Sequence, residues 1–366
     1  MDTASLSHVF SASGPFATVL IDVSHDSEDG EHEHELRVRE ATSTLTEHGA
    51  SEKVVESVAQ QLGELVHRPA PVGRLLVANA EGMLLDEVFG SRVDQPTVSW
   101  GPLPDLSSWI AHRDATTSFV LALVDHVGGD VAVYDSDVPE ADEETSVEGE
   151  THHAHKVPVG GWSALRYQHV TENVWAENAQ EVADRVRAYV EERGEELVLL
   201  AGDPQSRPIV VAALENLPAT VVELSSGTRN EDGGDEALQQ AIREALLAEA
   251  VRRRTELSHD LRNRMGRGES VATGVHDVAD AFVRGQVETL LLDAQAAAEH
   301  TLDPGQHPGL AISTTDTGPV RADQGLVAAA VLTSAAVSVV PSAALGGSPV
   351  AALLRWNQTA EGSDLR

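Results

Sequence analysis

Short runs of Val, Leu, Ile and Ala constrain the fold of this chain more than any other feature. Such runs lie at residues 16–23, 119–125 and 196–201, and segments with helical spacing of apolar residues separate them. Apolar runs of this length are typical of strands buried in a sheet, and their alternation with helices is typical of α/β proteins. Aromatic residues make up only 4% of the chain, so the cores must be aliphatic. The sequence therefore predicts the α/β fold class.

Turn residues and apolar spacing place the other elements. Two hairpins are expected, one of strands 74–79 and 83–89 and one of strands 119–125 and 130–134. Further strands are predicted at 220–224, 289–292 and 337–340. Helices are predicted behind an N-cap at Ser51 and at 178–193, 275–284 and 325–332, with a long helix after a linker at 228–235. Residues 140–150 carry six acids and no base, which predicts a solvated loop.

The length of 366 residues implies more than one domain, because domains usually hold about 100 to 200 residues. We expect three α/β domains, at residues 1–113, 114–232 and 233–366.

The net charge of −34 limits the partners of this chain. Broad binding to nucleic acid needs basic surface that displaces counterions, so any RNA contact must be local. The chain has no cysteine, which excludes disulfides and thiolate metal sites. No apolar stretch is long enough to span a membrane, and the first residues lack the pattern of a secretory signal. A cytoplasmic protein without a membrane partner is predicted.

Common enzyme motifs are absent from the sequence. We find no phosphate-binding loop, dinucleotide fingerprint, nucleophile elbow or zinc-binding His-Glu-x-x-His helix. Histidines cluster at His152, His153 and His155 and at His32 and His34, but without the i, i+4 spacing of a helical metal site. We therefore predict no catalytic residue, no metal and no cofactor.

One segment resembles a known family. Residues 160–167 read Gly-Gly-Trp-Ser-Ala-Leu-Arg-Tyr, which is similar to the Gly-Gly-Gln-Ser-Ala-Leu-Arg-Phe loop of archaeal and eukaryotic class-1 peptide release factors. A bare glycine pair marks ordinary turns. The continuation makes the match specific, and Trp162 replaces the glutamine of the family. Residues 280–292 also resemble the family segment Ala-Leu-x-x-Gly-Ala-Val-Glu-Thr-Leu-Leu.

The resemblance implies a three-domain architecture like that of release factors and Pelota. The N-terminal region lacks the Asn-Ile-Lys-Ser loop with which the family reads stop codons. The chain is most similar to the bacterial release-factor-like group that includes the hibernation factor Balon. The resemblance therefore implies a hibernation or dormancy factor in the vacant ribosomal A site, with ribosomal RNA as a contact and elongation factor Tu as a companion.

The chemistry of the loop follows from its third residue. Gly160 and Gly161 allow a close backbone approach to the ester of peptidyl-tRNA. The family's glutamine helps to place water and charge there, and the indole of Trp162 offers only one N–H donor. Hydrolysis should be lost, while stacking on a base becomes possible. The alternative is that Trp162 packs beneath the loop.

The predicted ribosome-binding residues form two sets. The first lies in and before the loop, where Arg166 either contacts phosphate or snorkels on the surface. The second is a basic stretch that is either an RNA-binding patch or a salt-bridged surface. The members are, in the first set, Lys156, Gly160, Gly161, Trp162, Ser163, Arg166 and Tyr167, and in the second, Arg252, Arg253, Arg254, Arg262, Arg264 and Arg267.

Two other functional classes remain open. The retained Gly-Gly pair with Ser163 and Arg166 is compatible with a rescue hydrolase or a tRNA-directed nuclease. The charge alone also fits an acidic interaction protein unrelated to translation.

Overall fold

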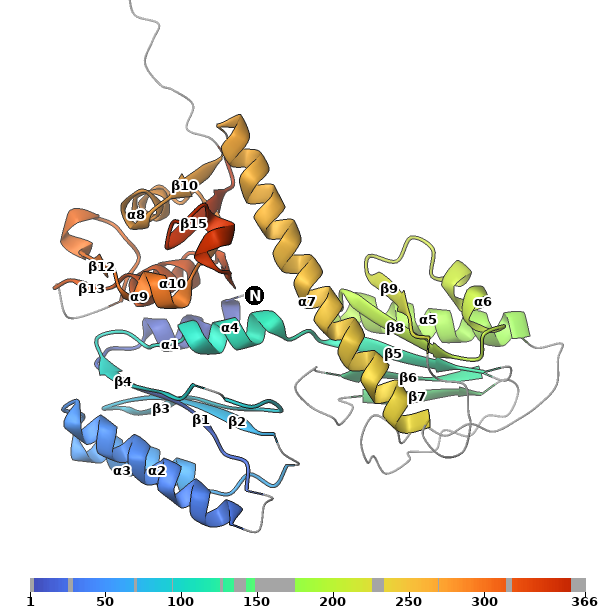
Figure 1. The fold of residues 1–366 in the computed structure, drawn as a ribbon, viewed down its shortest axis with the longest axis horizontal. Coiled ribbons are helices and arrows are strands. Elements are labelled where there is room, and N and C mark those ends of the chain that lie inside the picture. Colours follow the sequence, from blue (N-terminus) through green and yellow to red (C-terminus); the bar gives the residue numbers. More distant parts are fainter. Residues whose placement is uncertain are drawn as a thin grey trace, which may run out of the picture. The chain divides into compact units, whose positions relative to one another are not determined.

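The structure is a computed structural model that describes residues 3–25, 29–68, 71–93, 95–125, 128–134, 143–148, 175–225, 234–268, 270–313 and 318–356. These residues form two compact units, one from 1–114 with 253–366 and one from 115–252. Both units combine sheets and helices (Figure 1), which confirms the predicted α/β fold class. No helix of the described ranges is long and apolar enough to cross a lipid bilayer.

The N-terminal part of the first unit is an antiparallel sheet with helices on both faces. The sheet has the order β3-β2-β1-β4, and helices α2 and α3 pack on one face through the aliphatic side chains of their inner sides. Short helices η1, α1 and α4 lie on the other side (Figure 1). The elements are η1 (Ala4–Leu6), α1 (Ser7–Ser11), β1 (Phe16–Asp22), α2 (Gly30–Glu47), α3 (Glu52–Gly63), β2 (Gly73–Asn79), β3 (Gly82–Phe89), β4 (Thr97–Gly101) and α4 (Ser107–Ala115).

The C-terminal part of the same unit has a mixed sheet of order β10-β15-β11-β14, in which only β11 and β14 run parallel. Helices α8 and α10 pack against it. The elements are the end of α7 (Gly234–Arg267), β10 (Val271–Thr273), α8 (Val275–Val283), β11 (Val287–Leu292), α9 (Ala294–Ala298), β12 (Thr301–Leu302), η2 (Pro304–Gln306), β13 (Val320–Arg321), α10 (Ala322–Leu332), β14 (Ala336–Val339), η3 (Ser342–Leu345) and β15 (Val350–Leu354).

The two parts of this unit share one hydrophobic core and a buried polar network. Side chains of α1 and α4 pack in the same cluster as those of α10. Arg321 bonds to Asp105 at 2.6 Å and to Asp323 at 2.6 Å, and Ser107 donates to Asp323 at 2.9 Å. Asp114 accepts a bond from the hydroxyl of Ser338 at 2.6 Å. Residues 1–114 and 253–366 are thus joined by specific contacts, and the division into three domains stays a prediction.

The second unit is a five-stranded sheet of order β7-β6-β5-β8-β9. Strands β5, β8 and β9 run parallel, while β6 and β7 continue the sheet antiparallel. Helices α5 and α6 cover one face, and the first part of α7 covers the other. The elements are β5 (Phe119–Val124), β6 (Gly128–Tyr134), β7 (Glu143–Glu148), α5 (Trp175–Arg193), β8 (Leu197–Gly202), α6 (Arg207–Ala213) and β9 (Thr220–Glu223).

Most predicted elements are confirmed, and several observed elements were not predicted. Both hairpins, the long helix and the strands predicted at 16–23, 196–201, 220–224, 289–292 and 337–340 lie where the sequence placed them. Helix α2 was missed because the few residues of its inner face, among them His34, Ala41 and Leu45, lie between charged neighbours. Strand β4 and helix α4 were missed in a stretch interrupted by prolines. Ser51 does precede α3, but its side chain makes no capping hydrogen bond.

The prediction of a solvated loop at 140–150 was wrong for residues 143–148, which form β7. This strand pairs with β6 over its whole length. Its pairing with β6 supplies backbone hydrogen bonds along the strand, so the acidic composition did not prevent strand formation.

Candidate functional site

The loop with the family-like motif lies outside the described residues, but both of its anchors are described. It falls between β7, which ends at Glu148, and α5, which begins at Trp175. The predicted binding residues of the loop, from Lys156 to Tyr167, are therefore not placed by the structure. Their assignment to a ribosome-binding site stays a prediction.

Both anchors lie at one edge of the second unit. Glu148 pairs with Gly128, and Gly129 pairs with Val124, the last residue of β5. Helix α5 passes this edge, because a Cβ atom on Gly129 would lie 3.2 Å from Val182 of that helix. Strand β7 thus ends, and helix α5 passes, where the parallel strands β5 and β8 have their carboxyl ends. In open α/β sheets, this edge is the usual place for ligand-binding loops.

Close backbone packing holds this edge together. Gly202 ends β8 with a φ of +116°, and a Cβ atom there would lie 1.9 Å from the carbonyl oxygen of Val124. Only glycine fits this approach. The next residue, Asp203, accepts hydrogen bonds from the backbone N–H groups of Gln205 at 2.8 Å and Ser206 at 2.9 Å. These carboxylate contacts shape the turn into α6, so Asp203 has a structural role.

A small polar cluster fixes β7 to α5. The hydroxyl groups of Thr145 and Tyr189 lie 2.9 Å apart, and Arg185 donates to Thr145 at 3.0 Å. The guanidinium of Arg185 also lies 4.1 Å from the centre of the Tyr189 ring, within the range of a cation–π contact. Burial raises the pKa of the nearby Glu144 carboxyl. The strand and the helix that hold the ends of the loop are therefore tied to each other.

Two arginines of the basic stretch on α7 are paired with neighbouring acids. Arg252 bonds to Glu249 at 2.5 and 2.8 Å. Arg264 lies 2.9 Å from Asp260 and 3.4 Å from Glu288. The pairing with Asp260 is the main reason why the pKa of Arg264 is raised.

The other arginines of this stretch also lie on α7. Arg262 donates to a backbone carbonyl at 3.0 Å, and Arg253 and Arg267 have interaction partners of their own. The buried Nε of Arg254 has no hydrogen-bond partner among the described residues. The observed pairs fit the salt-bridged alternative better than an open phosphate-binding patch, and RNA binding by these six arginines stays a prediction.

The histidines at the start of α2 have different environments. His34 is buried, and its Nε2 bonds to the carbonyl oxygen of Leu62 at 2.8 Å. Burial, more than its charged neighbours, lowers the pKa of His34. His32 is exposed and lies 3.9 Å from Glu35. Within the described ranges, no group of three or more His, Asp or Glu side chains has the geometry of a metal site.

Comparisons with known proteins find release-factor-like relatives for part of the chain. Residues 118–267 match bacterial archaeo-eukaryotic release factor family 2. An uncharacterized protein of Mycobacterium tuberculosis is 27% identical over 299 residues, which cover 80% of this chain and 78% of that protein. The Pelota homologue of Sulfurisphaera tokodaii is 33% identical over 124 residues, 33% of this chain and 36% of the homologue.

Solved structures of the same kind align over most of the chain. S. cerevisiae Dom34, a translation termination-like factor, has a TM-score of 0.45 at 7% identity and covers 98% of this chain and 95% of its own. Archaeal Pelota, from a model of ribosome-bound Pelota and ABCE1, has a TM-score of 0.41 at 15% identity. The alignment covers 96% of this chain and 94% of Pelota. The sequence matches cover part of the chain. Residues 118–267 match bacterial archaeo-eukaryotic release factor family 2, and a third of the chain is similar to a Pelota homologue.

Proposed function

We propose that this chain is a ribosome-associated hibernation factor that occupies the vacant A site without hydrolysing peptidyl-tRNA. One observation carries the proposal. The region that matches the release-factor family contains Gly160 and Gly161 followed by Trp162, where release factors have glutamine. The two glycines allow the same close backbone approach as in the family's loop, and the indole of Trp162 cannot take the polar role of the glutamine in hydrolysis.

The arrangement of the loop anchors supports the proposal. Strand β7 ends, and helix α5 passes, at the same end of the sheet, and β7 and α5 are tied by the cluster around Tyr189. Its one lysine, Lys156, with Arg166 supplies the local positive charge that RNA contact requires in a chain of net charge −34.

Co-sedimentation with idle ribosomes tests binding. The purified chain should pellet with vacant ribosomes, and Trp162→Ala should weaken the interaction about tenfold if the indole stacks on a base. Trp356→Ala is the matched control, because Trp356 is an exposed tryptophan in the other unit. Each series is run with and without elongation factor Tu, which we propose as a companion. Absence of the chain from every ribosomal fraction would refute the proposal.

A peptide-release assay separates binding from hydrolysis. The wild-type chain should leave peptidyl-tRNA in the ribosome intact, and Trp162→Gln should gain release activity because it restores the polar side chain of the family. Ser163 and Arg166 favour a second candidate, a rescue hydrolase, since both match the catalytic family's loop. Peptide release by the wild-type chain that Trp162→Gln changes little would establish that second function instead.

A further inference from the structure

The N-terminal part of the first unit contains a cavity of about 910 Å³ between α2 and the β4 side of the sheet. This volume is that of a typical ligand pocket. Its walls come from four separate segments of the chain and combine an apolar surface with four charged side chains. The lining includes Ile21, Asp22, Arg37, Glu40, Arg92 and Val98.

The arginines of the cavity are already engaged within the chain. Arg37 donates to the carbonyl oxygen of Ser24 at 3.1 Å and to Glu33 at 3.1 Å, and it lies 3.4 Å from the side chain of Asp22. These partners belong to β1, the loop that follows it and α2. Arg92 also has an interaction partner. Neither arginine therefore offers a full set of donors to an incoming anion.

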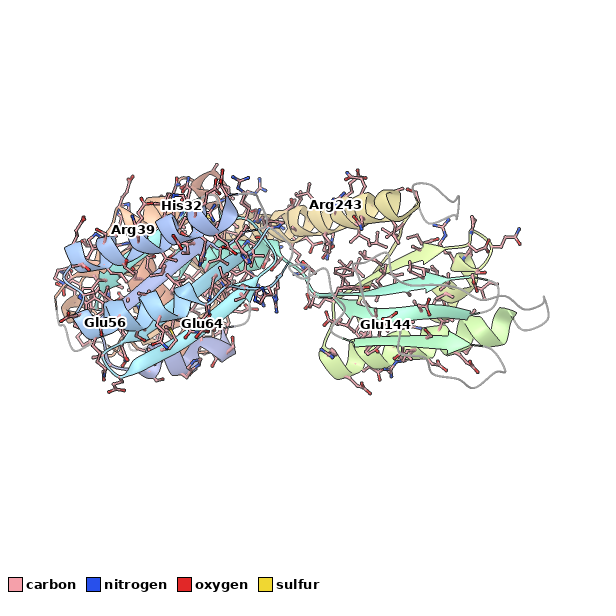
Figure 2. The ribbon with its side chains drawn as sticks, turned by 90° about the horizontal axis from the view of Figure 1, so that it is seen from below. His32, Arg39, Glu56, Glu64, Glu144 and Arg243 are labelled. Carbon is pink, nitrogen blue, oxygen red and sulfur yellow. The ribbon has the colours of Figure 1, made fainter. Side chains whose placement is uncertain are left out.

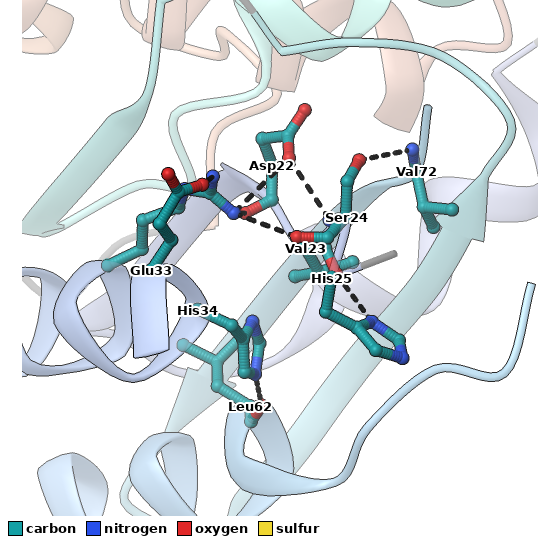
Figure 3. Close-up of polar contacts among 9 residues, drawn as sticks. Asp22, Val23, Ser24, His25, Glu33, His34, Leu62 and Val72 are labelled. Atoms are coloured by element: carbon teal, nitrogen blue, oxygen red, sulfur yellow. Dashed lines mark hydrogen bonds and ion pairs between the residues drawn. The ribbon is translucent and has the colours of Figure 1, made fainter. Parts of the chain in front are cut away.

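The carboxylates of the cavity keep unused acceptors. One oxygen of Asp22 accepts from the backbone N–H of Ser24 at 3.0 Å and faces Arg37. Its second oxygen is turned away from these partners (Figure 3) and has none among the described residues. Glu40 has no side-chain hydrogen bond or ion pair to the part of the chain that the structure describes. The unused hydrogen-bonding capacity is thus acceptor capacity on negative groups.

The cavity adjoins an open sheet edge. Strand β4 pairs with β1 on one side and is the last strand of its sheet on the other. Val98 of β4 and Ile21 of β1 belong to the α2-facing side of the sheet, and both line the cavity. An extended peptide can add to such an edge by backbone hydrogen bonds, and alternate side chains of the peptide then point toward the face where the cavity lies.

We propose that this cavity binds an arginine side chain from an extended basic segment of a partner protein. A guanidinium has a planar fork of donors that matches carboxylates, and its aliphatic stem suits the wall formed by Ile21 and Val98. The net charge of −34 attracts a basic segment and repels phosphate. Binding of a basic segment by this cavity does not depend on the proposed ribosome binding, so it can be tested with the isolated chain.

The test is a titration followed by methyl NMR. The chain has five isoleucines, namely Ile21, Ile110, Ile209, Ile242 and Ile312, so a sample labelled at isoleucine δ-methyl groups gives a signal for the cavity and four internal controls. The Ile21→Val variant identifies the cavity signal. The ligand is a capped Val-Arg-Val-Arg-Val peptide, compared with the same peptide carrying neutral citrulline, with free arginine and with guanosine monophosphate.

The arginine peptide should shift the Ile21 signal in a saturable way and leave Ile209 and Ile242 unchanged. Glu40→Gln should weaken its binding about tenfold, the loss expected for one hydrogen bond between charged groups. Glu56→Gln is the control of equal charge, because Glu56 is an exposed residue of α3 outside the cavity lining (Figure 2).

Four results would overturn the proposal. They are an Ile21 signal that the arginine peptide does not move, citrulline peptide binding as tightly as arginine peptide, tighter binding of guanosine monophosphate, and equal weakening by Glu40→Gln and Glu56→Gln. Free arginine binding as tightly as the peptide would overturn the assignment to a partner's extended segment.

Discussion

The buried network around Arg321 makes a sharp prediction about the first unit. Arg321 bridges Asp105 and Asp323 at 2.6 Å each, and the two aspartates are 6% and 0% exposed. The substitution Arg321→Met keeps an aliphatic stem and leaves both carboxylates buried without their cation. Removing one partner from a fully buried ion pair costs about 3 to 5 kcal/mol. The Arg321 side chain is 41% exposed, so water can partly replace it. We therefore expect a loss of about 2 to 3 kcal/mol.

The loss should depend on pH with a definite sign. Burial raises the pKa of Asp105, Arg321 opposes that rise, and Asp323 adds to it. A carboxyl whose pKa is raised in the folded state stabilises the fold at low pH, and this contribution is lost as pH rises through the raised pKa. Without Arg321 the pKa of Asp105 should rise further. The difference between variant and wild type should therefore be smaller at pH 5 than at pH 7.5.

Native-state hydrogen exchange with mass spectrometry measures this effect. Peptides from β14 and α4 should lose protection in Arg321→Met, while peptides from residues 115–252 serve as an internal control because they belong to the other unit. An unchanged protection of the first unit would refute the reasoning, as would a loss of equal size at both pH values.

Two further predictions concern backbone packing and the hydrogen bond between His307 and Asp280. Gly202→Ala should destabilise the second unit by more than about 2 kcal/mol, because the new Cβ would collide with the carbonyl oxygen of Val124 at a positive φ. Urea unfolding followed by circular dichroism measures the free energy of unfolding, and an unchanged value would contradict the prediction. The hydrogen bond from His307 is the largest cause that lowers the pKa of Asp280. A carboxyl with a lowered pKa stabilises the fold above its ordinary pKa, and this contribution is lost as pH falls through the lowered value. Asp280→Asn should therefore remove this pH dependence of folding stability. NMR titration of the Asp280 carboxyl checks the direction, and a midpoint at or above that of an ordinary aspartate would contradict it.

Local patterns were sufficient for much of the fold. The apolar run at 119–124 specifies a buried strand, and the turn signal at Glu81 and Gly82 specifies the first hairpin, because both depend on residues close in sequence. The charge-rich helix α2 gave a weak signal. Its few apolar residues form a helix face only because the sheet packs against them. Strand β7 likewise depends on its partner β6.

Some features of the candidate site follow from local sequence, and others depend on tertiary contacts. The residues Gly160, Gly161 and Trp162 were recognised from their order alone, and the family match contains them. The pairing of Arg264 with Glu288, and of Arg321 with Asp105, could not be read from the sequence, because these partners are separated by 24 and 216 residues. Charge type is a property of the sequence, whereas neutralisation of a charge depends on what folds beside it.

By itself, the sequence determined the α/β class and the resemblance of residues 160–167 to the release-factor loop, since both are written in neighbouring residues. Only the tertiary structure decided that residues 1–114 and 253–366 share one core and that Arg252 and Arg264 of the basic stretch are paired with acids. It also decided that Asp22 and Glu40 face a common cavity. The physical reason is that burial and charge compensation arise from contacts between segments distant along the chain, and local sequence patterns do not encode those contacts.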